Sequence, residues 1–137
     1  MLDPTTKTNR AMIIAPLDPS GEQVRDAVRQ VLQELGMEVF RADTLQVGSN
    51  LTYEIINAIE SSDLIIADVS KQNPNVFYEL GFAHALRKPT LLMTSQEGLS
   101  RVPTDLSSNH YLIYDLSNLS DFQNTLKRMI QRNLVTA

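Results

Sequence analysis

The segment from Asp68 to Leu86 carries the residues best suited to chemistry, because it sets one acid among apolar and aromatic side chains. If a helix begins at Pro74, then Asn75, Glu79 and Ala83 lie along one stripe of its surface. The other neighbours of the acid are Phe77, Tyr78, Leu80 and Phe82. A half-buried carboxylate in such surroundings can act as a nucleophile or as a general acid or base. Glu79 is therefore the best candidate for a reactive residue.

Short apolar strands alternating with amphipathic helices must position this segment. Strands are expected over residues 11–16, 37–41, 64–67, 90–93 and 111–114, and helices over 20–35, 50–59, 74–86 and 120–130. Short links between alternating elements favour parallel strands with right-handed crossovers. We expect an α/β fold, namely a flavodoxin-like or Rossmann-like doubly wound sheet of five parallel strands in three α/β/α layers, with strand order 2-1-3-4-5. The stretch 95–110 is long enough for a functional loop or a short extra helix.

Helix ends are predicted from capping patterns. Two capping boxes, a start signal before the third helix and a stop signal are expected. They are Ser20 with Gln23, Ser120 with Gln123, Asn73 before Pro74, and Gly36; Asn50 can cap the second helix. Gly81 within the third helix costs roughly 1 kcal/mol against alanine, which predicts close packing or ligand approach there.

Polar residues concentrate where the predicted strands end. In a doubly wound sheet the ligand crevice lies outside the carboxyl ends of the strands, at the point where the strand order reverses. The residues selected by that rule are Pro16 to Ser20 (which includes Asp18), Arg41 with Asp43, Asp68 to Asn75, Thr94 to Gly98, and Asp115.

Each of these residues also has an ordinary structural interpretation. Glu79 could be a solvated helix residue, and Asp68 and Asn73 could simply cap a turn and a helix. Arg41 and Asp43 could pair with each other. The two histidines fit structural or surface positions: His84 and His110. Spacing alone therefore supports an α/β domain with a small-molecule crevice.

Composition limits the possible partners and cofactors. The 137 residues suit one domain, here 11–137 after a polar leader 1–10, and the net charge of −4 gives no reason to expect nucleic acid or a membrane. With no cysteine and two histidines, neither a thiolate site nor a His-rich metal centre is expected, and no cofactor is predicted. The start of the chain lacks the apolar region of a signal peptide, so a cytoplasmic protein is expected.

The string from Ala67-Asp-Val-Ser through Asn73-Pro-Asn-Val-Phe-Tyr-Glu-Leu-Gly to Lys88-Pro resembles the nucleoside 2-deoxyribosyltransferase superfamily. This superfamily includes 2′-deoxynucleoside 5′-monophosphate N-glycosidases and TIR-like nucleotide-binding proteins. Ile13-Ile-Ala-Pro-Leu17 resembles its first-strand turn, and Arg41-Ala-Asp43 recurs in its uncharacterised branch. The resemblance runs from about Ala11 to Asp115.

The resemblance implies roles for several residues. Glu79 would attack the anomeric carbon of a sugar, and the ribosyl–enzyme ester would pass to water or to a second base. Asp68 would act with it by contacting the base or the sugar. Glu54 lies within a residue of the position where the family has another acidic group. The substrate-binding positions would be Pro16, Asp18, Ser20, Arg41, Asp43, Glu54, Asn73, Asn75 and Tyr78. The helix N-terminus at Asn73 would be an anion site.

The sequence also departs from the family pattern. Pro-Leu-Asp-Pro-Ser replaces the glycine-rich phosphate turn, and Asn75, Val76 and Phe77 replace small residues, which narrows the pocket. The expected substrate is a nucleoside, a nucleotide or NAD. The alternatives to N-glycosidic cleavage or transfer are a TIR-like NAD glycohydrolase and a non-catalytic nucleotide-sensing module. Relatives are commonly dimers, so a homodimer or larger homo-oligomer is expected, with Phe77, Tyr78 and Phe82 suited to the contact.

Overall fold

Five parallel strands form the centre of the molecule. The structure, a computed structural model, describes residues 9–16, 18–41, 51–101 and 111–135. The strands are β1 (Arg10–Ile14), β2 (Glu38–Arg41), β3 (Leu64–Asp68), β4 (Thr90–Ser95) and β5 (Tyr111–Tyr114). They pair in parallel in the order β2-β1-β3-β4-β5, which confirms the predicted flavodoxin-like sheet.

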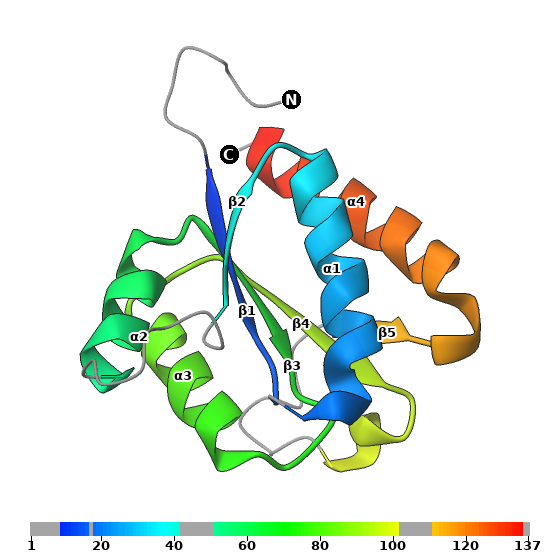
Figure 1. The fold of residues 1–137 in the computed structure, drawn as a ribbon, viewed down its shortest axis with the longest axis horizontal. Coiled ribbons are helices and arrows are strands. Elements are labelled where there is room, and N and C mark those ends of the chain that lie inside the picture. The colour runs from blue at the N-terminus through cyan, green and yellow to red at the C-terminus, as the bar shows by residue number, and fades with distance from the viewer. Residues whose placement is uncertain (1–8, 17, 42–50, 102–110, 136–137) are drawn as a thin grey trace.

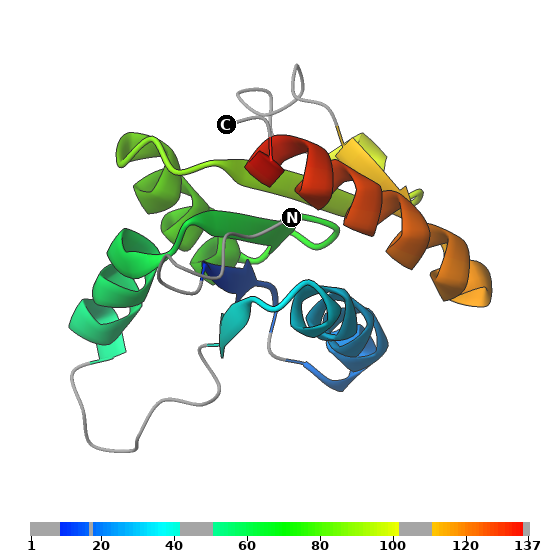
Figure 2. The ribbon, with the colours of Figure 1, turned by 90° about the horizontal axis from the view of Figure 1, so that it is seen from above.

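Four helices cover the two faces of the sheet. They are α1 (Glu22–Glu34), α2 (Leu51–Ser61), α3 (Pro74–Ala85) and α4 (Leu119–Val135). Helices α1 and α4 lie on one face and α2 and α3 on the other, so the three α/β/α layers are confirmed (Figures 1 and 2). The first strand already includes Arg10, the last residue of the predicted leader, which pairs in register with Glu38.

The central strands divide their side chains between two cores. In β1, Ala11 and Ile13 join the core under α1 and α4, whereas Met12 and Ile14 join the core under α2 and α3. All five residues of β3 are buried, as expected for a central parallel strand. Because β1 and β3 are parallel neighbours, their carboxyl ends lie at the same edge of the sheet. The loops that follow these two strands carry several of the predicted site residues.

The start of α1 differs from the predicted capping box. A short 3-10 helix (Pro19–Gly21) precedes α1, and the Asp18 carboxylate caps it by accepting a hydrogen bond from the Gly21 amide at 3.0 Å. Helix α1 then begins at Glu22 without a side-chain cap. The Ser20 prediction is wrong because the aspartate two residues earlier makes the cap.

The start of α4 differs in the same way. Helix α4 begins at Leu119, so Ser120 lies inside it, and the Asn118 side chain accepts from the Asp121 amide at 3.3 Å. Gln123 donates instead to the carbonyl oxygen of Ala27 at 2.9 Å, which ties α4 to α1.

The other helix signals gave mixed outcomes. Asn73 and Pro74 begin α3 as predicted, and Gly36, with a φ of 75°, follows the end of α1. The expected cap Asn50 lies outside the described residues. In the stretch 95–110 the described part contains a short 3-10 helix, Gly98–Arg101.

Two glycines have opposite surroundings, and one corrects a prediction. A Cβ atom added to Gly81 of α3 would meet nothing within 4 Å, so close packing is wrong there, and ligand approach, the other predicted reason for this glycine, stays a prediction. A Cβ atom added to Gly98 would lie 2.6 Å from the Cα of Ser70 and 2.7 Å from its carbonyl oxygen. Backbone atoms cannot move aside as a flexible side chain can, so Gly98 is required for the close approach to the β3–α3 loop.

These surroundings predict opposite effects of the same substitution. Gly81→Ala should stabilise the protein by about 0.5–1 kcal/mol, because it improves helix propensity without a clash. Gly98→Ala should destabilise it by about 1–3 kcal/mol through overpacking. Urea denaturation of both variants beside the wild type measures the difference, and equal effects of the two substitutions would contradict this reading of the packing.

Candidate active site

Glu79 lies in the second turn of α3 and is half-buried. Within the described residues its carboxylate has no hydrogen bond and no ion pair. Burial raises the pKa of Glu79 from 4.5 to about 7, because removal from water disfavours the charged form. Such a carboxylate is weakly solvated, and it can gain a bond to a reacting atom without first losing a protein partner.

Asp68, at the end of β3, has a contrasting environment. The side chain is buried, and one of its oxygens accepts a hydrogen bond from the Ser70 amide at 2.9 Å. Its other oxygen accepts from the Tyr114 hydroxyl at 3.0 Å. Asp68 therefore caps the turn that leaves β3, the structural interpretation considered above, and it also joins β3 to β5.

Ser70 extends these bonds to β4. Its hydroxyl lies 2.8 Å from the Tyr114 hydroxyl and accepts a hydrogen bond from the Ser95 amide at 2.7 Å. Asp68, Ser70, Ser95 and Tyr114, called here the Ser70 network, thus connect the carboxyl ends of three adjacent strands. Burial, and next the charge of Asp68, raise the pKa of Tyr114 to about 12, so its hydroxyl remains a donor at physiological pH.

The structure places Asp68 and Glu79 on different sides of the sheet edge. Tyr114 packs in the core under α1 and α4, with its ring 5.8 Å from that of Phe122 on α4 in an edge-to-face arrangement. Asp68 bonds to Tyr114 on that side, whereas α3, which carries Glu79, covers the opposite face. No contact within the described residues joins the two carboxylates. A ligand that touches both must span the carboxyl edge of the sheet.

The loop after β1 is held by two charged side chains from elsewhere in the chain. Arg25 of α1 is buried, and its guanidinium donates to the carbonyl oxygen of Pro16 and, at 2.8 Å, to that of Asp18. Lys71, in the loop after β3, lies 2.9 Å from the Asp18 carboxylate. Pro16, Asp18 and Lys71 therefore meet where the strand order reverses between β1 and β3, as the crevice rule predicts.

The sequence interpretation missed Arg25, although one signal marks it. Arg25 lies three residues before Val28 and seven before Leu32, on the apolar stripe of α1. A charged residue on a buried stripe requires hydrogen-bond partners inside the protein. Two of its nitrogens have them, and Nε is buried without one among the described residues.

At the start of α3, Asn73 acts as a helix cap. Its side-chain oxygen accepts hydrogen bonds from the amides of Asn75 at 2.9 Å and Val76 at 3.3 Å. These amides are the donors that the predicted anion site would use, so the cap and an anion compete for them. The Asn75 side chain is exposed.

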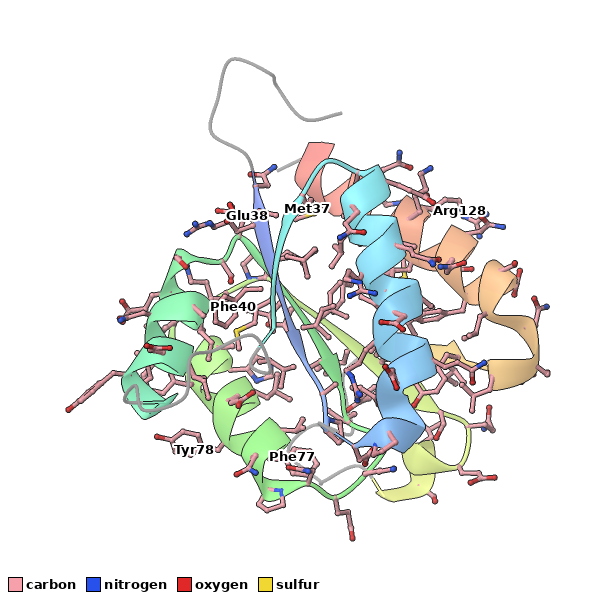
Figure 3. All side chains as sticks on the ribbon, in the orientation of Figure 1. Met37, Glu38, Phe40, Phe77, Tyr78 and Arg128 are labelled. Atoms are coloured by element: carbon pink, nitrogen blue, oxygen red, sulfur yellow. The ribbon has the colours of Figure 1, made fainter. Side chains whose placement is uncertain are left out.

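The aromatic residues around Glu79 have different exposures. Tyr78 is 60% exposed and extends away from α3 (Figure 3), whereas Phe77 and Phe82 pack against the core under α2 and α3. Of the three aromatics expected at a subunit contact, Tyr78 is the exposed one.

The predicted residue Glu54 lies in a separate groove between α2 and β2. The groove, of about 410 Å³, is lined by Arg10, Glu38, Val39, Phe40, Glu54, Asn57, Ala58, Ser61 and Ser62. Figure 3 shows Phe40 on this side of β2. No hydrogen bond or ion pair joins Glu54 to the other described candidates. Asp43 and the side chains of Ser20 and Arg41 fall in the parts of the chain that the structure does not describe.

A second, larger pocket opens over the Ser70 network. It has a volume of about 700 Å³ and is lined by Ser70, Lys71, Ser95, Gln96, Glu97, Ile113, Tyr114, Asp115 and Leu116. Its size falls in the range of small-molecule sites. Thus the residues expected after β3, β4 and β5 do come together, as the strand-end rule predicts.

The described residues contain neither a cluster of metal ligands nor a helix that could span a membrane. In the described ranges no three His, Asp or Glu side chains are grouped so as to hold a metal ion. Among the helices as far as they are described, none is both long and apolar enough to cross a membrane.

No family model and no curated protein match the sequence. Solved structures do share the fold. A CMP N-glycosidase from Clostridium botulinum superposes with a TM-score of 0.69 at 21% identity, over 88% of this chain and 99% of that chain. A 2-deoxyribosyltransferase from Bacillus psychrosaccharolyticus gives 0.64 at 18% identity, over 84% and 90%.

TIR domains share the fold as well. The TIR domain of a Toll-related receptor from Hydra magnipapillata superposes with a TM-score of 0.66 at 22% identity, over 88% of this chain and 97% of that chain. At these identities the similarity is one of fold. The predicted resemblance to the deoxyribosyltransferase superfamily, with its N-glycosidase and TIR-like branches, is confirmed at that level.

The raised pKa of Glu79 predicts a pH-dependent stability. Between pH 4.5 and about 7 the unfolded chain loses the Glu79 proton while the folded protein keeps it, so stability falls as pH rises and levels off above 7. The loss should be about 1–2 kcal/mol after allowance for partial exposure. Urea denaturation across pH 4–8 should show it in the wild type but not in Glu79→Gln; parallel curves for the two proteins would contradict it.

Proposed function

We propose that this protein cleaves or transfers the N-glycosidic bond of a nucleoside or nucleotide, with Glu79 as the nucleophile. The observation that carries the proposal is the half-buried Glu79 carboxylate, which has no partner within the described residues and a pKa of about 7. Its position on α3, the helix that follows the loop at the carboxyl end of β3, supports the same role. N-glycosidase and deoxyribosyltransferase enzymes share the fold, which is consistent with this chemistry.

The reaction would proceed in two displacements. The Glu79 carboxylate forms an ester bond to the anomeric carbon while the bond to the base nitrogen breaks, and the base takes that electron pair and a proton from solvent. Water or a second base then attacks the same carbon and loses a proton to solvent, while the ester bond breaks and Glu79 leaves as a carboxylate. About half of the Glu79 side chains are ionised at pH 7, so the nucleophilic form is available near neutral pH.

The remaining predicted residues have supporting roles in this proposal. Asp68, fixed by Ser70 and Tyr114, would contact the sugar or base from the far side of the edge. Residues that follow β1, end or follow β2, or lie at the start and in the first turns of α3 would bind the substrate: Pro16, Asp18, Ser20, Arg41, Asp43, Asn73, Asn75 and Tyr78. The groove position of Glu54 gives it less support as a substrate contact.

The decisive test is base release by the wild type and by Glu79→Gln. Glutamine keeps the shape of the side chain but cannot form the ester, so release should fall by at least about 10³-fold. Chromatography after incubation with nucleosides, nucleoside monophosphates and NAD detects the free base. Glu60→Gln is the matched control, because Glu60 is exposed on α2 and should leave release unchanged.

The same screen separates the alternatives. Release from NAD alone would assign a TIR-like NAD glycohydrolase, and the fold shared with a TIR domain is compatible with that alternative. Saturable thermal stabilisation by a nucleotide without any free base would assign a sensing module. The protonated fraction of Glu79 at pH 7 favours that alternative, because a protonated carboxyl is a poor nucleophile. Undiminished release by Glu79→Gln would remove the proposed nucleophile.

A homodimer or larger homo-oligomer is also part of the proposal. Tyr53 on α2 and Tyr78 on α3 are 66% and 60% exposed, and these helices pack side by side. Large exposed aromatic side chains are enriched at interfaces. Light scattering should give at least twice the chain mass, and the double substitution Tyr53→Ser with Tyr78→Ser should shift the protein towards monomer by about tenfold in dissociation constant. A monomer at all concentrations would contradict this assignment.

A further inference from the structure

The loop between β3 and α3 leads directly to the helix that carries Glu79, and Ser70 is its second residue. Ser70 is 8% exposed and makes three hydrogen bonds, to Asp68, Tyr114 and Ser95. Three residues later Asn73 caps α3. Ser70 therefore ties the loop before α3 to β4 and β5 close to the helix start.

Tyr114 supplies the long-range part of this restraint. Its hydroxyl lies 2.8 Å from the Ser70 hydroxyl and donates to Asp68 at 3.0 Å, across separations of 44 and 46 residues. The phenol ring is itself fixed, because it is 9% exposed and packs edge-to-face on Phe122. A hydroxyl on a fixed ring offers one geometry, so both partners must adopt it.

The packing around Ser70 leaves little freedom from the other side. Gly98 approaches so closely that a Cβ atom there would lie 2.6 Å from the Cα of Ser70. The Gly98 amide donates to the Ser95 hydroxyl at 3.0 Å, and the Ser95 amide donates to Ser70 at 2.7 Å. Ser70 is thus held between the β4–β5 connection and Tyr114.

We infer that Tyr114 and Ser70 are positioning residues, which act through the β3–α3 loop to hold the start of α3, and with it Glu79, in a reactive orientation. This inference rests on the proposed function of Glu79. Neither hydroxyl needs to touch the reacting atoms, since each already bonds within the protein. Their effect is on geometry, and a misplacement of about 1 Å can cost 10²-fold in rate.

Tyr114→Phe tests the inference with the smallest change. The ring and its contact with Phe122 stay, while the bonds to Asp68 and Ser70 are lost. We expect amide hydrogen exchange of residues 69–76 to accelerate at least about tenfold, with exchange in α1 and α4 unchanged. Tyr111→Phe is the matched control, because Tyr111 lies on the same strand but packs towards α2 and α3. Exchange that is unchanged in Tyr114→Phe would overturn the inference, whatever the activity.

Kinetics on the substrate found in the screen give the second readout. In Tyr114→Phe, kcat should fall by roughly 10- to 100-fold with a smaller change in KM, well below the melting temperature. Ser70→Ala should lose a similar factor, and the double variant should lose less than the product of the two factors, because both substitutions remove the bond between Ser70 and Tyr114. A lower melting temperature with kcat and KM within twofold of the wild type would show a purely structural role and overturn the inference.

Failure of the proposed function gives a different pattern. If the wild type releases no base from any probe, or if Glu79→Gln remains active, the proposed function fails. Faster amide exchange confined to residues 69–76 in Tyr114→Phe would then still establish that the two hydroxyls hold the loop. The part of the inference that they position Glu79 for reaction would be overturned. Localised exchange together with the kcat loss and inactive Glu79→Gln supports both proposals.

Discussion

The hydrogen bonds of Ser70 hold together the carboxyl ends of β3, β4 and β5, where the loop towards Glu79 begins. In a parallel sheet the carboxyl ends of all strands meet at one edge, and the loops that leave it must satisfy polar groups near a buried core. Asp68 and Ser70 lie at the end of a strand that is buried along its whole length. Their hydrogen bonds to Tyr114 and Ser95 satisfy these polar groups inside the protein. The same bonds join the carboxyl ends of β3, β4 and β5.

The two acids at this edge have opposite relations to their surroundings. Asp68 is engaged on both oxygens, by an amide and by a phenol, so rotation would break bonds that the interior cannot replace. Glu79 is half-buried with no such partner among the described residues, and burial raises its pKa to about 7. A carboxylate that neither water nor the protein solvates well is destabilised as an ion. A bond to an electrophilic carbon removes the negative charge and with it this unfavourable free energy. The engaged acid is suited to holding structure, and the unengaged acid is suited to reaction.

The sequence predicted the fold well because the fold follows from local periodicity. Apolar runs such as 64–67 and the helical spacing of α1 identify buried strands and amphipathic helices without knowledge of distant contacts. Helix starts were less predictable, since Asp18 and Ser20 are both good caps and only the loop geometry decides between them. Glu79 could be singled out because its neighbours within the same helix are apolar.

The Ser70 network could not be found in the same way. Ser70 and Tyr114 are 44 residues apart, and each resembles an ordinary strand end until the sheet order brings β3, β4 and β5 together. Arg25 left a local trace, a charge on an apolar stripe, but its partners are carbonyl oxygens, which every sequence contains. Hydrogen bonds between side chains at a sheet edge thus depend on the order of the strands. The sequence shows which residues are polar, but not which of them bond to each other.

The helix start at Asn73, which the resemblance assigns to an anion, and the turn that replaces the family's phosphate turn both use their amides internally. Asn73 occupies the amides of Asn75 and Val76, and Asp18 occupies that of Gly21. A glycine-rich turn offers its amides without a competing side chain, whereas a phosphate here must displace a cap worth about 1 kcal/mol. Lys71 can offset that cost, because its ion pair with Asp18 is exposed and such pairs contribute only about 0–1 kcal/mol. A phosphate at this edge therefore depends on Lys71 more than on backbone amides. An uncharged nucleoside needs neither the lysine nor the amides.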